Sequence, residues 1–294
     1  MKRSLILTVI AGALLFSPLW ALEIELTGGL NNMVFDPEQT SAYGREIGEF
    51  PGYTFIHGNL TIKDDISDKY SYNVRFNRDA ILQNSVGGSV VIDLDYLNME
   101  FGPFIGILNT PEQPLSAGIS GGVKIAYPGI VFLGFKGSST IGFKGGFQGD
   151  YSQEAVEANV GFWLPFIIPS ASVNVKRFTR QEENSLLIRD ELTRYLASAD
   201  IFAKNSPFIF RLDFGYESLA RIYNDKSSAK NEEQIDEVMA MFAGLEVKWQ
   251  LMKMLRLIAG AEIPIYTWSE QPVRKMLNSD VFFYKFNAGI ALTF

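Results

Sequence analysis

Apolar and polar side chains alternate along the end of the chain, from Phe282 to Phe294. Counting back from Phe294, every second residue is apolar or aromatic. The residues between them are small or polar from Lys285 onward. Successive side chains of a β-strand point to opposite faces, whereas the same alternation on a helix would put apolar residues on every side. The segment is therefore predicted to be a strand with one apolar face. The apolar set consists of Phe282, Tyr284, Phe286, Ala288, Ile290, Leu292 and Phe294.

The same alternation recurs through most of the chain in segments of about ten residues. After residue 21, no stretch approaches the roughly 18 apolar residues that a membrane helix needs. Dispersed alternation is typical of transmembrane barrels, in which one strand face meets lipid and the other meets the lumen. We predict an all-β protein, a transmembrane antiparallel up-and-down β-barrel. The clearest segments are 23–31, 56–63, 70–77, 90–96, 119–127, 156–164, 208–217, 245–249 and 255–263.

The connections between these segments are of two kinds. Short turns on one side and long loops on the other are typical of such barrels, and chain ends on the same side require an even strand number. We predict about 14 strands, taking 90–109 as one long strand without a turn at Gly102-Pro103, and 12 is the alternative. The stretch 185–197 fits either a loop helix or the start of a strand. Short connections are expected at 64–68, 165–169, 204–207 and 250–253, and long ones at 36–52, 179–189, 220–236 and 267–280.

The N-terminus has the layout of a secretory signal peptide. Lys2 and Arg3 precede an apolar run at 5–16, which is followed by the sequence Ser-Pro-Leu-Trp-Ala. The run is short for a membrane anchor, so cleavage after Ala21 is expected. The predicted organisation is a signal peptide at 1–21 and a single barrel domain at 22–294.

The last eight residues also carry a motif. Asn287, Gly289, Leu292 and Phe294 fill, in order, the polar, glycine, apolar and terminal aromatic positions of the C-terminal assembly signal of bacterial outer-membrane β-barrels, and the chain resembles that family. The resemblance implies the outer membrane of a diderm bacterium, contact with outer-membrane lipids and insertion by the β-barrel assembly machinery. A homo-oligomer is also compatible with the resemblance. The alternative is a soluble protein that ends on a core or edge strand.

The amino-acid composition argues against several classes of function. The chain contains no cysteine, which excludes a lipid-anchored N-terminus, disulfides and thiolate chemistry. The formal net charge is −7 and becomes −9 once Lys2 and Arg3 are removed, so nucleic acid is not an expected partner. The aromatic-rich, cysteine-free composition is similar to that of spirochaete barrels.

Enzymatic chemistry is not expected. The chain has a single histidine, His57, on the polar side of a predicted strand. Asp93 and Asp95 could form a carboxylate pair and serve a histidine general base, but no serine motif and no metal-ligand spacing accompany them. His57 is better interpreted as an ordinary wall residue, and no cofactor is implied.

The polar faces of the strands are the more informative constellation. Charges of both signs in a water-filled lumen can select small polar solutes. Alternatively, they can pair with each other and fill a narrow lumen. About 14 strands give a bore wider than side chains alone fill. We therefore predict a porin-like channel for passive passage of small polar solutes, with Arg75, Lys124, Arg211 and Lys285 as selectivity candidates. The predicted lumen-lining residues are Arg75, Asp93, Asp95, Lys124, Glu157, Lys176, Arg211, Asp213, Glu217, Glu246, Lys248, Arg256, Glu262 and Lys285.

Two other functions fit the same architecture. A surface adhesin or interaction barrel would act through its long loops, with Tyr43, Phe50 and Tyr223 as contacts. A hydrophobic-substrate transporter similar to the fatty-acid transporters is disfavoured, because the first strand begins at Glu23 and leaves no room for the N-terminal plug of that family.

Overall fold

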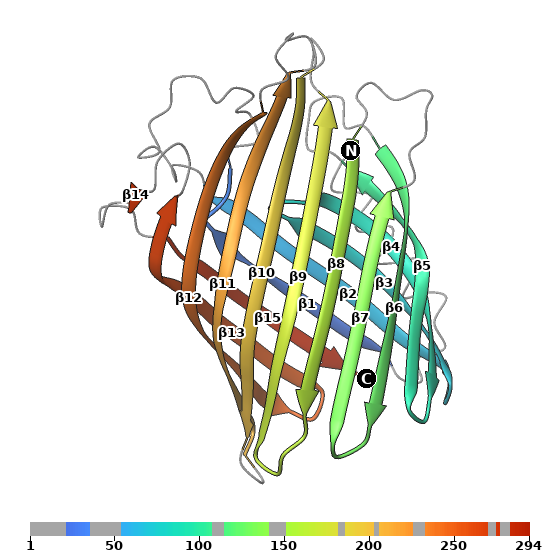
Figure 1. Cartoon of the computed structure of the whole chain (residues 1–294). Helices are drawn as coiled ribbons and strands as arrows, with labels where there is room; N and C mark the ends of the chain where they lie inside the picture. The colour runs from blue at the N-terminus through green and yellow to red at the C-terminus, as the bar shows by residue number, and fades with distance from the viewer. Residues whose placement is uncertain are drawn as a thin grey trace.

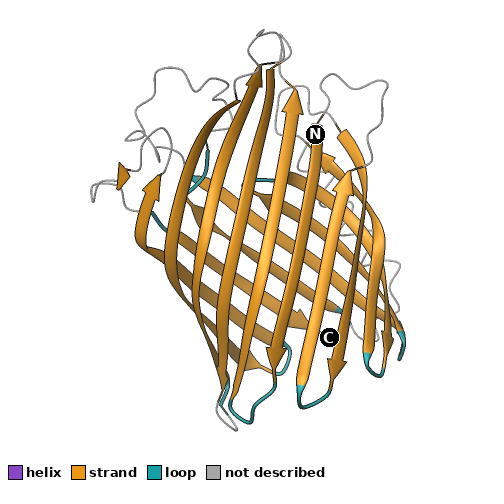
Figure 2. Cartoon of the chain, in the orientation of Figure 1, coloured by secondary structure: helices purple, strands orange, loops and turns teal. Residues whose placement is uncertain are grey.

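The computed structural model describes residues 22–35, 54–107, 115–140, 151–181, 186–202, 206–225, 233–269, 275–276 and 283–294. These residues form strands joined by turns (Figure 2), and none of them belongs to a helix long and apolar enough to cross a membrane. The strands are β1 (Glu23–Asn31), β2 (Phe55–Ser67), β3 (Tyr70–Asp79), β4 (Gln83–Leu94), β5 (Leu97–Ile107), β6 (Leu115–Tyr127), β7 (Val131–Thr140), β8 (Tyr151–Phe162), β9 (Ile167–Gln181), β10 (Leu186–Phe202), β11 (Phe208–Asp225), β12 (Glu233–Met252), β13 (Leu255–Ser269), β14 (Lys275–Met276) and β15 (Lys285–Thr293).

Fourteen of these strands close into a barrel (Figure 1). From β1 to β13 the order in the sheet follows the order in the chain, and each strand is antiparallel to its neighbours. The barrel closes because β15 pairs with β1 on one side and with β13 on the other. The two-residue β14 pairs with the end of β13 and adds no strand to the wall. The predictions of an all-β barrel and of fourteen strands are confirmed.

The two ends of the barrel differ. At one end, which we call the turn end, β2–β3, β4–β5, β6–β7, β8–β9, β10–β11 and β12–β13 are joined, and the tight turns there include 68–69, 95–96 and 253–254. The C-terminus lies at the same end, where the Thr293 amide bonds the Met254 carbonyl. The opposite end, the loop end, carries the connection 32–54 and the segment between β13 and β15. Figure 1 shows the short turns at the bottom of the barrel, on the side where the C-terminus lies.

Several predicted boundaries are wrong. The region 90–109 is two strands rather than one, because the chain turns at Asp95-Tyr96, where no glycine or proline marks the turn. The predicted turn at 64–68 is the end of β2, and the turn lies at 68–69. The predicted loop 179–189 is mostly strand, since β9 reaches Gln181 and β10 begins at Leu186, which also makes 185–197 a strand. Likewise, β11 and β12 occupy most of 220–236. The parts of these strands nearest the loop end carry many polar residues, so their sequence resembles that of a loop.

The exterior of the barrel is apolar. Outward-facing side chains such as Ile56, Ile119 and Ile265 are 60–64% exposed, and none of the described residues covers them. Aromatic rings gather at two levels, with Tyr96 stacked on Tyr127 near the turn end and Trp268 among tyrosines nearer the loop end. A broad exposed apolar band between two aromatic girdles is the surface that a bilayer covers. Further members are Phe208 and Trp249 at the first level, and Tyr195, Tyr216 and Tyr266 at the second.

Candidate functional site in the barrel lumen

Charged side chains on the inner faces of the strands pair with one another. Arg211 on β11 forms a two-pronged contact with Asp200 on β10, with N–O distances of 2.7 and 2.9 Å. Next to it, the Ser198 hydroxyl lies 2.6 Å from Asp213. These pairs lie toward the turn end, where the cross-strand register places Asp200 opposite Arg211. Lys248 lies 3.3 Å from Glu246, which also accepts a hydrogen bond of 3.2 Å from Asn287.

A second group of pairs lies on β1 to β7 and β13. Arg75 lies 2.7 Å from Glu100, which also accepts a hydrogen bond of 2.6 Å from the Ser89 hydroxyl. Lys136 reaches the other oxygen of Glu100 at 4.0 Å. Arg256 lies 3.6 and 3.7 Å from Glu23 and Glu25 on β1.

The remaining predicted lumen residues have other surroundings. Asp93 and Asp95 are exposed at the turn end, Asp95 within the turn itself, and neither is brought to His57. The Lys124 amine lies 5.0 Å from the centre of the Phe132 ring. Glu157 accepts a hydrogen bond of 3.5 Å from Asn159. Among the described residues, no group of histidine and acidic side chains could hold a metal ion.

The densest charge network lies midway along the lumen. Arg194 on β10 contacts Glu217 at 3.1 Å and Glu262 at 2.9 Å, and its guanidinium carbon lies 4.2 Å from the centre of the Phe242 ring. Lys285 on β15 contacts the second oxygen of Glu262 at 3.5 Å. Two carboxylates and two cations thus neutralise each other across four strands. Glu217, Glu262 and Lys285 were predicted to line the lumen, but Arg194 was not, because β10 carries apolar residues on both faces.

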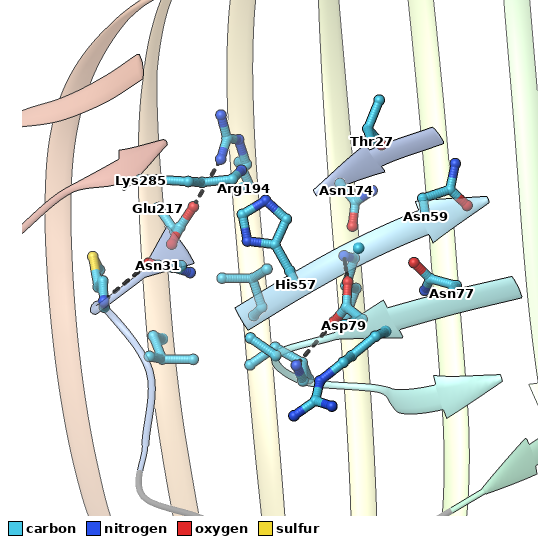
Figure 3. A pocket seen from close by; sticks show the side chains of 18 residues that line it. Thr27, Asn31, His57, Asn59, Asn77, Asp79, Asn174, Arg194, Glu217 and Lys285 are labelled. Carbon is cyan, nitrogen blue, oxygen red and sulfur yellow. Dashed lines mark hydrogen bonds and ion pairs between the residues drawn. The ribbon is translucent and has the colours of Figure 1, made fainter. Parts of the chain in front are cut away.

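A cavity of about 300 Å³ lies beside this network. Residues from β1, β2 and β3 line it on one side, and residues from β9, β10 and β11 on the other (Figure 3). His57 enters it because Gly29, its partner in β1, leaves room for the ring; a Cβ there would lie 2.8 Å from the imidazole. The cavity therefore lies in the lumen, between facing walls of the barrel. Its lining includes Thr27, Asn59, Asn77, Asp79, Asn174, Lys176, Arg194, Glu217 and Lys285.

Toward the loop end, apolar side chains fill the interior. This mouth cluster is 1–9% exposed, far less than side chains that line an open, water-filled lumen would be. Its members come from strands on opposite sides of the barrel, so the cluster crosses the lumen. Within the part of the chain that the structure describes, it occupies the interior above the cavity. The mouth cluster consists of Met33, Phe35, Ile81, Phe178, Leu219, Val238, Ala240 and Phe283.

The β3–β4 connection reaches across the lumen to join this cluster. The Asp79 carboxylate accepts the amides of Ile81 and Leu82 at 2.8 and 3.0 Å and forms an ion pair with Lys176 on β9. Gln153 on β8 donates its side-chain amide to the Leu82 carbonyl. In the sheet, β3 and β9 are separated by five strands, so these contacts span the interior rather than run along the wall. We call residues 79–82 the tip.

A buried ion pair supports the loop end. The side chains of Arg221 and Asp190 are 2% and 8% exposed, with one N–O distance of 2.8 Å, and the guanidinium lies 4.8 Å from the Phe35 ring centre. Tyr223, close to the end of β11, is 5% exposed. Tyr223 is therefore a buried wall residue and not the exposed loop contact that the sequence suggested; Tyr43 and Phe50 lie outside the described residues.

Replacing Arg221 with Met is expected to lower the free energy of unfolding by about 3–5 kcal/mol, because Asp190 would remain buried without its cation. The matched control is Arg211→Met, whose pair with Asp200 is 34% and 22% exposed and should matter much less. The midpoint of urea unfolding in micelles measures both. Equal small losses in the two variants would refute the assignment, whereas recovery in Arg221→Met with Asp190→Leu would support it.

Comparisons with known proteins find only distant structural similarity. No protein family matches the sequence, and no curated protein matches it. Similar solved structures include OmpT of Vibrio cholerae (TM-score 0.42, 10% identity, 93% of this chain and 97% of that one) and an anion-selective porin from Comamonas acidovorans (0.41, 9%, 93% and 98%). A Pseudomonas aeruginosa FadL homologue aligns with a TM-score of 0.48 at 10% identity, over 93% and 88% of the chains. These scores are too low to carry an inference about activity.

The closed barrel and its apolar exterior define the class of protein. The chain is a fourteen-stranded transmembrane β-barrel.

Proposed function

We propose that this protein is an outer-membrane channel for small polar solutes whose extracellular mouth is closed at rest. The single observation that carries the proposal is the charged and amide-lined cavity between facing walls of the barrel, directly below the mouth cluster. Short turns of such barrels face the periplasm, so the loop end is extracellular. Polar solutes would pass through the lumen when the mouth cluster separates.

The alternatives receive less support. An adhesin would act through loops such as 36–52, which lie outside the described residues. A transporter of hydrophobic substrates needs an apolar hollow inside the barrel. The larger apolar hollows, of about 500 and 810 Å³, are lined by outward-facing residues such as Val173 and Leu257 and so belong to the lipid-facing surface.

Delivery to the membrane belongs to the same proposal. The segment 1–21, which lies outside the described residues, would direct export and be cleaved near Ala21. The β-barrel assembly machinery would then recognise Asn287, Gly289 and Leu292 on β15, the strand that closes the barrel, together with Phe294 directly after it. A homo-oligomer stays a prediction.

The tip is the natural moving part of the mouth. It is a short connection held by an ion pair, a side-chain amide and apolar contacts, whereas the wall strands are held by continuous ladders. Gln83, the first residue after it, has a φ of 62°, a left-handed conformation that costs a non-glycine residue free energy. Withdrawal of the tip would release this strain and uncover the lumen.

Replacing Asp79 with Asn tests the channel. The substitution keeps an oxygen for the turn amides but removes the charge that holds Lys176, so we expect the open fraction to rise about tenfold, from the loss of about 1.4 kcal/mol. Planar-bilayer recordings of refolded residues 22–294 measure it, using only material that heat-sensitive gel migration shows to be folded. The control is Asp93→Asn, an exposed carboxylate at the turn end. If neither folded variant conducts in planar bilayers, the proposed channel is refuted.

A further inference from the structure

We infer that the lumen cavity binds a small, uncharged, polyhydroxylated solute of the monosaccharide or polyol class. This inference rests on the proposed channel and names its substrate class. Three features carry it: the carboxylates that line the cavity are already paired with cations, neutral hydrogen-bonding groups on facing walls are unpaired, and one side of the cavity is apolar.

The ionic groups that line the cavity are engaged with one another. Lys176 pairs with Asp79, and Arg194 and Lys285 pair with the carboxylates of Glu217 and Glu262. An anionic or cationic solute would have to break one of these pairs and leave its partner uncompensated, which is costly in a partly buried site. A neutral solute meets no such penalty.

Arg78 also borders the cavity, and its charge is differently engaged. Its guanidinium carbon lies 5.3 Å from the centre of the Phe55 ring, within the range of a cation–π contact. Its Nε is buried and has no hydrogen-bond partner among the described residues. This cation is thus held against an aromatic ring at the edge of the cavity.

The hydrogen-bonding groups left over are neutral and lie on facing walls. The buried Nδ1 of His57 on β2 and Oδ1 of Asn174 on β9 have no hydrogen-bond partner among the described residues. Figure 3 shows Asn59 and Asn77 on the same side as His57, across from Asn174. Amides and imidazoles each donate and accept, as hydroxyl groups do, so one molecule with several hydroxyls can bridge both walls.

The side of the cavity toward the loop end is apolar. Met33, Ile81 and Leu219 of the mouth cluster belong to its lining, together with Leu192. A sugar ring presents C–H groups on its faces and hydroxyls at its edge, which matches an apolar ceiling above an amide-rich wall. A volume of about 300 Å³ is at the small end of the range for ligand sites and suits one ring.

Saturation-transfer difference NMR on the folded barrel in micelles tests the inference without requiring conduction. The probes are D-glucose, glucuronate and glucosamine, which share a ring and differ in charge. We expect saturable binding of glucose and weaker binding of the two charged sugars. Binding of glucuronate tighter than that of glucose, or no saturable binding of any probe, would overturn the inference.

Two variants locate the site. His57→Phe keeps a ring beside Gly29 but removes both nitrogens, and Asn174→Leu removes the amide on the facing wall. Each is expected to weaken glucose binding about tenfold, whereas Asn98→Leu on β5, outside the cavity lining, should leave it unchanged. Equal weakening in all three variants would contradict the assignment.

Liposome swelling in glucose, measured in parallel, separates this inference from the channel. If the barrel passes glucose without saturable binding, the proposed channel stands and the binding site is refuted. If the barrel binds glucose but does not pass it, even as the Asp79→Asn variant, the binding site stands and the channel is refuted.

Discussion

Phe294→Asp is expected to reduce the amount of assembled barrel in the outer membrane by about tenfold or more. Phe294 is the last residue of the chain, its amide bonds the Leu22 carbonyl at 2.9 Å, and its side chain is 53% exposed on the lipid-facing side of the closing strand. A charge on this face near a membrane interface costs only about 0–1 kcal/mol. A large loss would therefore reflect failed recognition by the assembly machinery and not an unstable barrel.

Phe162→Asp is the matched control for this effect. Phe162 is also a phenylalanine at the turn end of its strand, with 51% of its side chain exposed, but it lies on β8, far from the chain terminus. The folded, heat-sensitive gel band in outer-membrane fractions measures assembly in both variants, and refolding into lipid vesicles measures intrinsic folding. Normal membrane levels and normal surface-protease accessibility of Phe294→Asp would contradict the role of the terminal motif. Equal loss in both variants would assign the effect to charge alone.

Crosslinking the tip to the facing wall is expected to abolish conduction. Ile81 of the tip and Phe178 of β9 are both members of the mouth cluster, 4% and 1% exposed. Replacing both with Cys removes volume from the cluster, which should loosen the mouth and raise the current. A short bismaleimide that joins the two thiols would then hold the tip against β9. Because the chain has no cysteine of its own, the reagent has no other thiol to react with.

Much of the fold could be predicted because period-two alternation can be recognised in each strand separately. The barrel class follows from repeated alternation, whereas the strand number rests on chain length and the need for an even count, since the segment 90–109, predicted as one strand, is two strands in the structure. The boundaries were less accessible: Asp95-Tyr96 turns without a glycine or proline, and residues 176–181 at the outer end of β9 are mostly polar, as in a loop. Local composition cannot distinguish a solvated hairpin from an irregular connection.

The candidate site was predicted only in part, because it depends on which strands face each other. Glu217 and Glu262 could be assigned to polar strand faces, but their shared partner Arg194 comes from a strand with apolar residues on both faces. The mouth cluster was missed altogether. Phe178 and Leu219 are single apolar residues on mainly polar faces, and only the closed barrel brings them together. Register and closure are long-range properties that alternation along one strand does not encode.

The most direct test of a channel closed at its mouth is the planar-bilayer current of the Ile81→Cys/Phe178→Cys barrel before and after bismaleimide treatment. Mass spectrometry establishes the crosslink, and each single-cysteine variant treated with the same reagent serves as a control. The account predicts steady ion-dependent steps before crosslinking and none afterwards, with the single variants still conducting. An unchanged current through the crosslinked barrel, or no current through the uncrosslinked folded one, would contradict it.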